Sequence, residues 1–328
     1  MATYWSGPFL LLGLLILLTP SCAVQVVAMT PAVFFFGDSI FDVGNNNYLD
    51  TIAKANIPPY GINFPGGTPT GRFTNGLNIA DFLSMQVGWK RSPPAFLSLA
   101  RRDFPMRIFS GVNFASGGAG ILNETGIIFV LIESVSNRNL YHDVVTSTGG
   151  NDIMQNLNPS NPLTPAKRTR WSRLLPQSTR HIYSGGPRKF GIMGMSNTGC
   201  IPSQRWQNDT GGCMEEPNDV ARRFKVVMTN VMQDLSSELG EMTYSCFDGI
   251  HLPPVGFAEM DTACCGSGKL NGERPCSPKT DLFVKRTDYY YWDAYHPTQT
   301  LAKGVADSMC NGSPPSVAPI NFNQLWRS

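Results

Sequence analysis

The sequence predicts an α/β fold in which a mainly parallel sheet is covered by helices on both faces. Short apolar runs alternate along the chain with segments of helical periodicity, an order typical of such sheets. Three of the runs end in glycine and small polar residues, the chemistry that lines the crevice at the carboxyl edge of a parallel sheet. No repeat or linker divides the 328 residues, which favours one large domain.

The first strand is predicted at residues 33–36, where Val33 precedes three phenylalanines. Four apolar residues in a row are typical of a strand buried on both faces. Gly37 then allows a sharp turn, and the following Asp38 and Ser39 would place one hydroxyl at the tip of the strand. The alternative interpretation is a strand followed by an ordinary Asp-Ser helix cap.

The later elements follow from the same patterns. Residues 58–76, rich in Gly, Pro and Asn, are expected to form a long irregular loop, and loops of that length are usually functional. The other predicted elements are a helix at 77–87, a strand at 109–115 before Ser116-Gly117-Gly118, a strand at 144–148 before Gly149-Gly150-Asn151-Asp152, a strand at 189–193, an amphipathic helix at 219–239 and a loosely packed tail at 312–328.

The N-terminus predicts secretion. The apolar block at residues 9–18 is too short to span a bilayer, and small residues follow it up to Ala23. Residues 1–23 are therefore interpreted as a signal peptide, and residues 24–328 as an extracellular or cell-wall domain without stable membrane insertion. No Lys or Arg precedes the block, so an uncleaved anchor is the alternative. Glycosylation sequons at Asn123, Asn208 and Asn311 fit a secreted glycoprotein.

Cleavage after Ala23 leaves seven cysteines, so at least one thiol is expected to be unpaired. Cys200 and Cys213 flank a short loop, as do the Cys264-Cys265 pair and Cys276, which predicts two local disulfides. A zinc site is the competing interpretation, but neither cluster has CxxC spacing or an adjacent histidine.

The charge balance gives no reason to expect a nucleic-acid partner. Lys and Arg total 26 against 24 Asp and Glu. The basic run at residues 167–170 lies among prolines and is interpreted as a solvated loop.

A serine nucleophile needs a base, and His296 is the candidate among the four histidines. Asp293, three residues earlier in an aromatic segment, could orient the imidazole from the same loop. An acyl-transfer site also needs donors for an oxyanion, for which the sequence offers the Asn151 amide and the N–H groups of Gly118 and Ser39. The alternative for Asp293 and His296 is a capping Asp beside a surface His. The alternative for Asn151 and Gly118 is that they only form turns.

In this order the segments resemble the GDSL esterase/lipase family of the SGNH hydrolases, in its plant secreted branch. The matching stretches are Phe-Phe-Phe-Gly-Asp-Ser-Ile-Phe-Asp-Val-Gly-Asn-Asn-Asn, Gly-Arg-Phe-Thr-Asn-Gly, Val-Asn-Phe-Ala-Ser-Gly-Gly-Ala-Gly, Gly-Gly-Asn-Asp, Gly-Cys-Ile-Pro, Ala-Cys-Cys-Gly and Trp-Asp-Ala-Tyr-His-Pro-Thr. The resemblance implies a three-layer, flavodoxin-like α/β/α sandwich. It implies Ser39 as nucleophile, His296 as base and Asp293 as orienting acid, with Ser39, Gly118 and Asn151 forming the oxyanion hole.

The resemblance further implies a secreted carboxylic-ester hydrolase, monomeric and without metal or organic cofactor, that works through an acyl-enzyme. Its substrates would be small-molecule or lipid esters, or acetylated polysaccharide. The segments after Gly118 and Tyr244 look shorter than in the family, and Phe283 stands where relatives often have a cysteine. A catalytically weak binding glycoprotein is therefore one alternative. An acyltransferase on the same site, in which an alcohol instead of water takes the acyl group, is the other.

Overall fold

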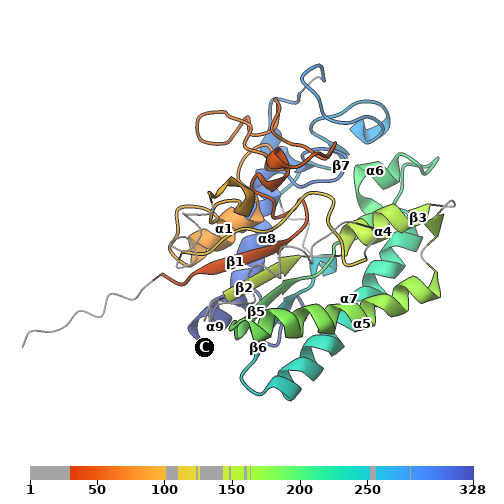
Figure 1. Cartoon of the computed structure of the whole chain (residues 1–328). Coiled ribbons are helices and arrows are strands. Elements are labelled where there is room, and N and C mark those ends of the chain that lie inside the picture. The colour runs from red at the N-terminus through yellow and green to blue at the C-terminus, as the bar shows by residue number, and fades with distance from the viewer. Residues whose placement is uncertain are drawn as a thin grey trace, which may run out of the picture.

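A five-stranded sheet with strand order β1-β2-β5-β6-β9 forms the centre of the molecule (Figure 1). The structure, a computed structural model, describes residues 30–100, 110–122, 125, 143–147, 149–158, 161–162, 164–251, 256–280 and 282–328. The strands are β1 (Val33–Gly37), β2 (Asp143–Ser147), β5 (Lys189–Met193), β6 (Thr243–Phe247) and β9 (Val317–Ala318). The first four are parallel and β9 is antiparallel to β6, so the mainly parallel sheet is confirmed.

Helices cover both faces of this sheet, which confirms the three-layer α/β/α architecture (Figure 1). The helices α5 (Pro165–Ser184) and α7 (Glu215–Leu239) pack on one face, and α1 (Ile79–Gln86), α8 (Gln299–Asn311) and α9 (Phe322–Arg327) on the other. Smaller elements are α4 (Gly150–Asn156), α6 (Pro202–Arg205), the pair β3 (Leu157–Asn158) and β4 (Asn161–Pro162), and the pair β7 (Glu259–Ala263) and β8 (Tyr289–Tyr291). Short 3-10 helices lie at Asn45–Tyr48, Phe96–Ser98, Thr198–Cys200, Gly249–His251, Lys269–Asn271 and Arg286–Asp288.

The apolar run of β1 is buried because its residues serve both faces in turn. Phe34 and Phe36 belong to the core beneath α5 and α7, whereas Val33 and Phe35 belong to the core beneath α1 and α8. Burial of side chains of this size stabilises the fold by about 1.5–3 kcal/mol each. The pattern explains why the strand shows no polar alternation.

Most predicted elements form within a few residues of their expected bounds. The strand at 189–193 is β5, and the helix at 219–239 begins four residues earlier, at Glu215. The helix expected at 77–87 is α1, which starts after Asn78 because this side chain accepts a hydrogen bond from the Asp81 N–H.

The strand expected at 109–115 does not form in the part that the structure describes, which begins at Ser110. Asn113 makes only isolated bridges, to Phe35 on one side and to Ala95 on the other. Its side-chain amide also donates to the Phe41 carbonyl (2.8 Å). The segment runs beside β1 as an irregular edge, because the polar groups of Asn113 are divided among Phe35, Ala95 and Phe41.

Two expectations of loose structure were wrong. The basic run at 167–170 lies within α5, which continues for 20 residues and contributes Trp171 to the core. The tail at 312–328 is tightly packed, since it supplies β9 and α9 and its Phe322 is fully buried. The Phe322 ring lies against Gly191, where a Cβ would stand 2.4 Å from it. Sequence composition alone did not reveal this apolar anchor among Ser and Pro.

Both predicted disulfides are present, Cys200–Cys213 and Cys265–Cys276. Cys246, Cys264 and Cys310 are free and buried. Burial raises the pKa of the Cys264 thiol to about 11, and its sulfur lies 4.0 Å from the Phe283 carbonyl. Among the described residues, no group of His, Cys, Asp and Glu could hold a metal ion.

The expectations for the N-terminus fall on residues 1–29, and one sequon falls on Asn123; both lie outside the described residues. None of the helices described is long and apolar enough to cross a membrane.

Candidate active site

Ser39 stands directly beyond the carboxyl end of β1. Gly37 makes this possible, since its φ is 149° and a Cβ there would lie 2.4 Å from the Ser147 carbonyl of β2. Ser39 does not start a helix, because the chain makes a turn in which the Asp42 N–H donates to the Asp38 carbonyl (3.0 Å). The hydroxyl is therefore held on a short, hydrogen-bonded turn.

A second tight loop carries His296. It follows β8 and closes on itself, because the Trp292 N–H donates to the His296 carbonyl (2.8 Å). Trp292 is fully buried beneath the loop, and Thr298 begins α8 by accepting from the Leu301 N–H. The imidazole is thus placed between a buried indole and a helix start.

The two loops bring together three of the predicted site residues. His296 Nε2 lies 2.8 Å from Ser39 Oγ, although 257 residues separate the two in the sequence. His296 Nδ1 lies 2.8 Å from both carboxylate oxygens of Asp293. A proton on Nδ1 would therefore point to Asp293, leaving Nε2 free to accept the Ser39 hydroxyl proton.

Asp293 is held in place by further donors. The N–H groups of Tyr295 and His296 donate to Oδ1 (2.9 and 2.8 Å), and the Tyr60 hydroxyl donates to Oδ2 (2.7 Å). Burial alone would raise the pKa of Asp293, but the neighbouring His296 and these hydrogen bonds hold it below its ordinary value. Asp293 is thus kept as a carboxylate inside a nearly dry site.

Tyr60 was not predicted from the sequence. Its ring packs edge-on against Phe73 and Trp292, and only 8% of the residue is exposed. The one available signal was its place in the loop at 58–76, which had been expected to be functional. A single tyrosine in a loop rich in Gly and Pro has no pattern that points to a carboxylate 233 residues away.

The other two predicted residues lie on segments beside Ser39. Gly118 has a φ of 87°, and a Cβ there would meet no atom within 4 Å, so its backbone faces open space. The Asn151 amide donates one hydrogen to the Ala119 carbonyl (2.8 Å), which leaves a second hydrogen available. Within the part of the chain that the structure describes, the N–H groups of Ser39 and Gly118 donate to no acceptor.

Buried carboxylates hold the backbone around these donors. Asp42 accepts from Gly44, Asn45 and Gly117 N–H groups (2.7, 2.7 and 3.0 Å), and Asp152 accepts from the N–H groups of residues 121 and 122. Burial raises the pKa of Asp42 to about 6. The Gly-rich segment at 116–122 is thereby fixed from both sides.

Removing the Tyr60 hydroxyl tests whether it positions the Asp293 carboxylate. Tyr60→Phe is expected to lower kcat for an ester roughly 3–10-fold and to move the acidic limb of the pH–rate profile to higher pH, because a less solvated carboxylate stabilises imidazolium more strongly. The free energy of unfolding should fall by about 1.5–3 kcal/mol. The pKa of Asp293 lies below its ordinary value of 3.8. The difference in free energy of unfolding between the wild type and Tyr60→Phe should therefore persist above pH 3.8 and shrink below it.

Tyr48→Phe is the matched control, since Tyr48 is 60% exposed in a neighbouring segment. Kinetics and thermal unfolding across pH give both readouts. A Tyr60→Phe protein that loses stability but keeps the wild-type pH profile would show that Tyr60 acts only on the fold.

Comparison with known proteins identifies the family of this chain. A family model described as GDSL-like Lipase/Acylhydrolase matches residues 33–309. The chain belongs to the GDSL lipase/acylhydrolase family. Among its relatives in Arabidopsis thaliana, GDSL esterase/lipase At5g55050 is 34% identical and the match covers 92% of each chain. GDSL esterase/lipase At4g28780 is 32% identical, and the match covers 90% of each chain.

Solved structures related to this GDSL protein are more distant. An extracellular lipase from Streptomyces rimosus is 12% identical, with a TM-score of 0.37 over 85% of this chain and 99% of that one. An acetyl xylan esterase from Geobacillus stearothermophilus is 13% identical, with a TM-score of 0.37 over 85% and 91%. Membership of the family makes this GDSL protein a serine hydrolase that acts on ester bonds.

Proposed function

We propose that this protein is a secreted carboxylic-ester hydrolase in which Ser39, His296 and Asp293 form the catalytic triad. The observation that carries the proposal is the pair of 2.8 Å contacts that His296 makes, through Nε2 to Ser39 Oγ and through Nδ1 to Asp293. A nucleophile, a base and a group that orients the base are what hydrolysis through an acyl-enzyme requires.

In the first half of the proposed reaction, His296 Nε2 takes the Ser39 proton as Oγ attacks the ester carbonyl. The imidazolium then gives that proton to the leaving alcohol, and the acyl-enzyme remains. In the second half, His296 takes a proton from water, which attacks the acyl group. The imidazolium then returns a proton to Ser39 Oγ as the bond to the acyl group breaks and the acid is released. Asp293 stays ionised and stabilises the imidazolium, and its lowered pKa favours this ionised form.

The oxyanion formed in each half would be stabilised by the N–H groups of Ser39 and Gly118 and by the Asn151 amide. Asn151→Ala is expected to lower kcat for p-nitrophenyl acetate by about 10²–10³-fold with little change in KM, because this donor acts mainly on the transition state. Steady-state kinetics at fixed pH measures both constants. A loss confined to KM would instead indicate a role in binding the ground state.

Covalent labelling tests the proposed nucleophile directly. A fluorophosphonate probe should label Ser39 in the wild-type protein, as read by peptide mass spectrometry, since only an activated serine reacts quickly. An ester panel of increasing acyl length, run beside this labelling, would define which small-molecule, lipid or acetylated-polysaccharide ester is preferred. Absence of labelling together with absence of turnover would favour a non-catalytic binding role.

Secretion is part of the proposal and rests on separate observations. Two disulfides indicate an oxidising compartment. The sequon residue Asn311 is exposed at the end of α8, where a glycan could be attached. Expression in a secreting plant cell, followed by glycosidase treatment and N-terminal sequencing, would test for cleavage after Ala23 and for glycans.

A further inference from the structure

The exposed apolar side chains of the described residues are concentrated around the proposed active site. Ten large hydrophobic residues are exposed in this part of the chain, and eight of them lie on three segments. We call these eight the apolar rim: Tyr48, Leu49, Ile52, Ile57, Ile62, Phe283, Val284 and Tyr295. Only Met85 and Val226 lie elsewhere. Isolated exposed hydrophobics need no explanation, but a concentration at one site indicates an interaction surface.

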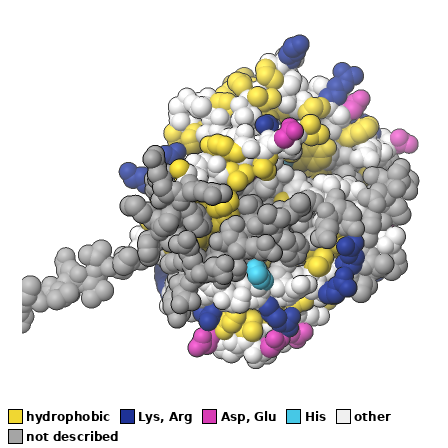
Figure 2. Space-filling model, viewed as in Figure 1, with side chains coloured by type: hydrophobic (Ala, Val, Ile, Leu, Met, Phe, Trp, Pro, Cys, Tyr) yellow, Lys and Arg dark blue, Asp and Glu magenta, His cyan; other side chains and the backbone are white. Residues whose placement is uncertain are grey.

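The segments of the rim are joined to one another beneath the surface. Ala55, Tyr60 and Trp292 share one buried cluster with the Cys265–Cys276 disulfide. Arg286 Nε donates to the Asn63 side chain (2.8 Å), which links the chain beside Ile62 to the chain beside Val284. Figure 2 shows hydrophobic side chains gathered over the end of the molecule formed by these loops, with both basic and acidic side chains at its edge.

This surface is continuous with the proposed active site. Tyr295 precedes His296 in the chain and is 50% exposed, and Tyr60, between Ile57 and Ile62, donates to Asp293. A partner seated on the rim would therefore lie against the loop that holds Asp293 and His296.

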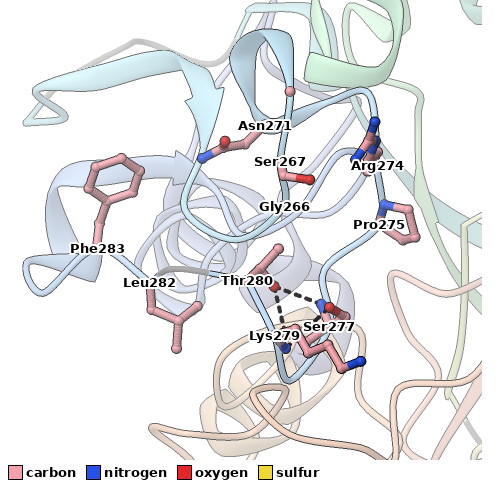
Figure 3. A pocket seen from close by; sticks show the side chains of 11 residues that line it. Gly266, Ser267, Asn271, Arg274, Pro275, Ser277, Lys279, Thr280, Leu282 and Phe283 are labelled. Atoms are coloured by element: carbon pink, nitrogen blue, oxygen red, sulfur yellow. Dashed lines mark hydrogen bonds between the residues drawn. The ribbon is translucent and has the colours of Figure 1, made fainter.

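Two cationic side chains beside the apolar rim fit an anionic partner. Residues 48–62 and 266–295, which carry the rim, contain six Lys and Arg against five Asp and Glu, and one of the five, Asp293, is buried. Arg274 and Lys279 line an open pocket of about 630 Å³, opposite Leu282 and Phe283 (Figure 3). Neither Arg274 nor Lys279 forms an ion pair with the carboxylates that the structure describes. The pocket therefore combines apolar and cationic walls, as an amphiphile with an anionic head group requires.

We propose that the apolar rim docks on an anionic lipid surface, so that ester substrates reach Ser39 from that surface. The fully exposed Ile52 and the 88% exposed Val284 lie on loops, from which apolar side chains can enter the lipid interface. Arg274 and Lys279 then meet the anionic head groups. The proposal deepens the proposed function, on which it rests, by naming aggregated anionic lipid as the setting of the reaction.

Vesicle sedimentation of the full-length mature protein tests the docking. The protein is expected to bind phosphatidylcholine vesicles more strongly when they contain phosphatidylserine. The rim variant Ile52→Ser/Val284→Ser should bind at least about tenfold more weakly, because two apolar side chains no longer enter the lipid. The charge variant Arg274→Gln/Lys279→Gln should lose roughly tenfold or more on vesicles with phosphatidylserine only.

Val226→Ser is the matched control, since Val226 is 58% exposed on α7 and lies outside the rim. All variants should hydrolyse soluble p-nitrophenyl acetate at the wild-type rate, since none of the changed residues contacts Ser39 or His296. Wild-type hydrolysis without vesicle binding, or equal binding by the rim variant and Val226→Ser, would overturn the docking proposal alone. Binding to polygalacturonate beads but not to vesicles would also overturn it, in favour of an acidic polysaccharide. If the wild-type protein does not hydrolyse the soluble ester, that result would instead count against the proposed function.

Discussion

Ser39→Ala is expected to lower kcat for p-nitrophenyl acetate by roughly 10⁴-fold or more while the fold stays intact. The change removes one oxygen at the tip of β1, which interacts with His296 Nε2 at 2.8 Å and supports no other element. No apolar contact is lost, so the unfolding temperature should stay within a few degrees of the wild type. Stopped assays over hours, with enzyme-free blanks, would measure the residual rate.

The matched control is Ser237→Ala, an exposed serine on α7 that bonds only the Gln233 carbonyl of its own helix. It should keep wild-type turnover and fluorophosphonate labelling, whereas Ser39→Ala should lose both. A Ser39→Ala protein that still turns over the ester at more than a few per cent of the wild-type rate would assign the nucleophile elsewhere. Labelling of another residue in that protein would identify it.

The sheet could be predicted from the sequence where burial leaves a local pattern. The strand β1 is an apolar run, and β2 and β5 have buried apolar residues at their centres, because both faces of the sheet are covered. The helix α7 shows its apolar stripe clearly. By contrast, β6 begins with the partly buried Thr243 and Tyr244 and was not predicted. The tail was misjudged for a related reason, since its stability comes from Phe322 packing on Gly191, a contact between distant residues.

The candidate site also contains residues that a local motif reveals and residues that only tertiary contacts reveal. Ser39 and the pair Asp293 and His296 stand in short motifs, so the sequence could name them, and the structure brings them together at 2.8 Å. Tyr60 could not be found, because its role depends on how one irregular loop folds over another. The long-range geometry of loops depends on tertiary contacts, which a single sequence does not display.

Arg72→Met is expected to lower the free energy of unfolding by about 3–5 kcal/mol, because it leaves the buried Asp81 carboxylate without its cation. Arg72 makes a bidentate ion pair with Asp81 (Nε to Oδ2 2.7 Å, Nη2 to Oδ1 2.8 Å), and both residues are buried. The Asp81 carboxylate also accepts from the N–H groups of Asn78 and Ser92 (3.0 Å each). One cation therefore supports the start of α1 and two loops.

The expected drop in unfolding temperature is about 6–15 °C, measured by circular dichroism at fixed pH. Lys303→Met is the matched control: it breaks the exposed Lys303–Asp307 pair on α8, and pairs of that kind contribute less than about 1 kcal/mol. Equal, small shifts in both variants would mean that Asp81 is satisfied by its backbone donors alone. A large shift for Arg72→Met only would show that Arg72 anchors the loop at 58–76. The neighbouring residue Phe73 packs its ring against His296, with centroids 4.9 Å apart. Activity of Arg72→Met should then fall at temperatures below its own unfolding transition, because the loop loosens before the sheet does.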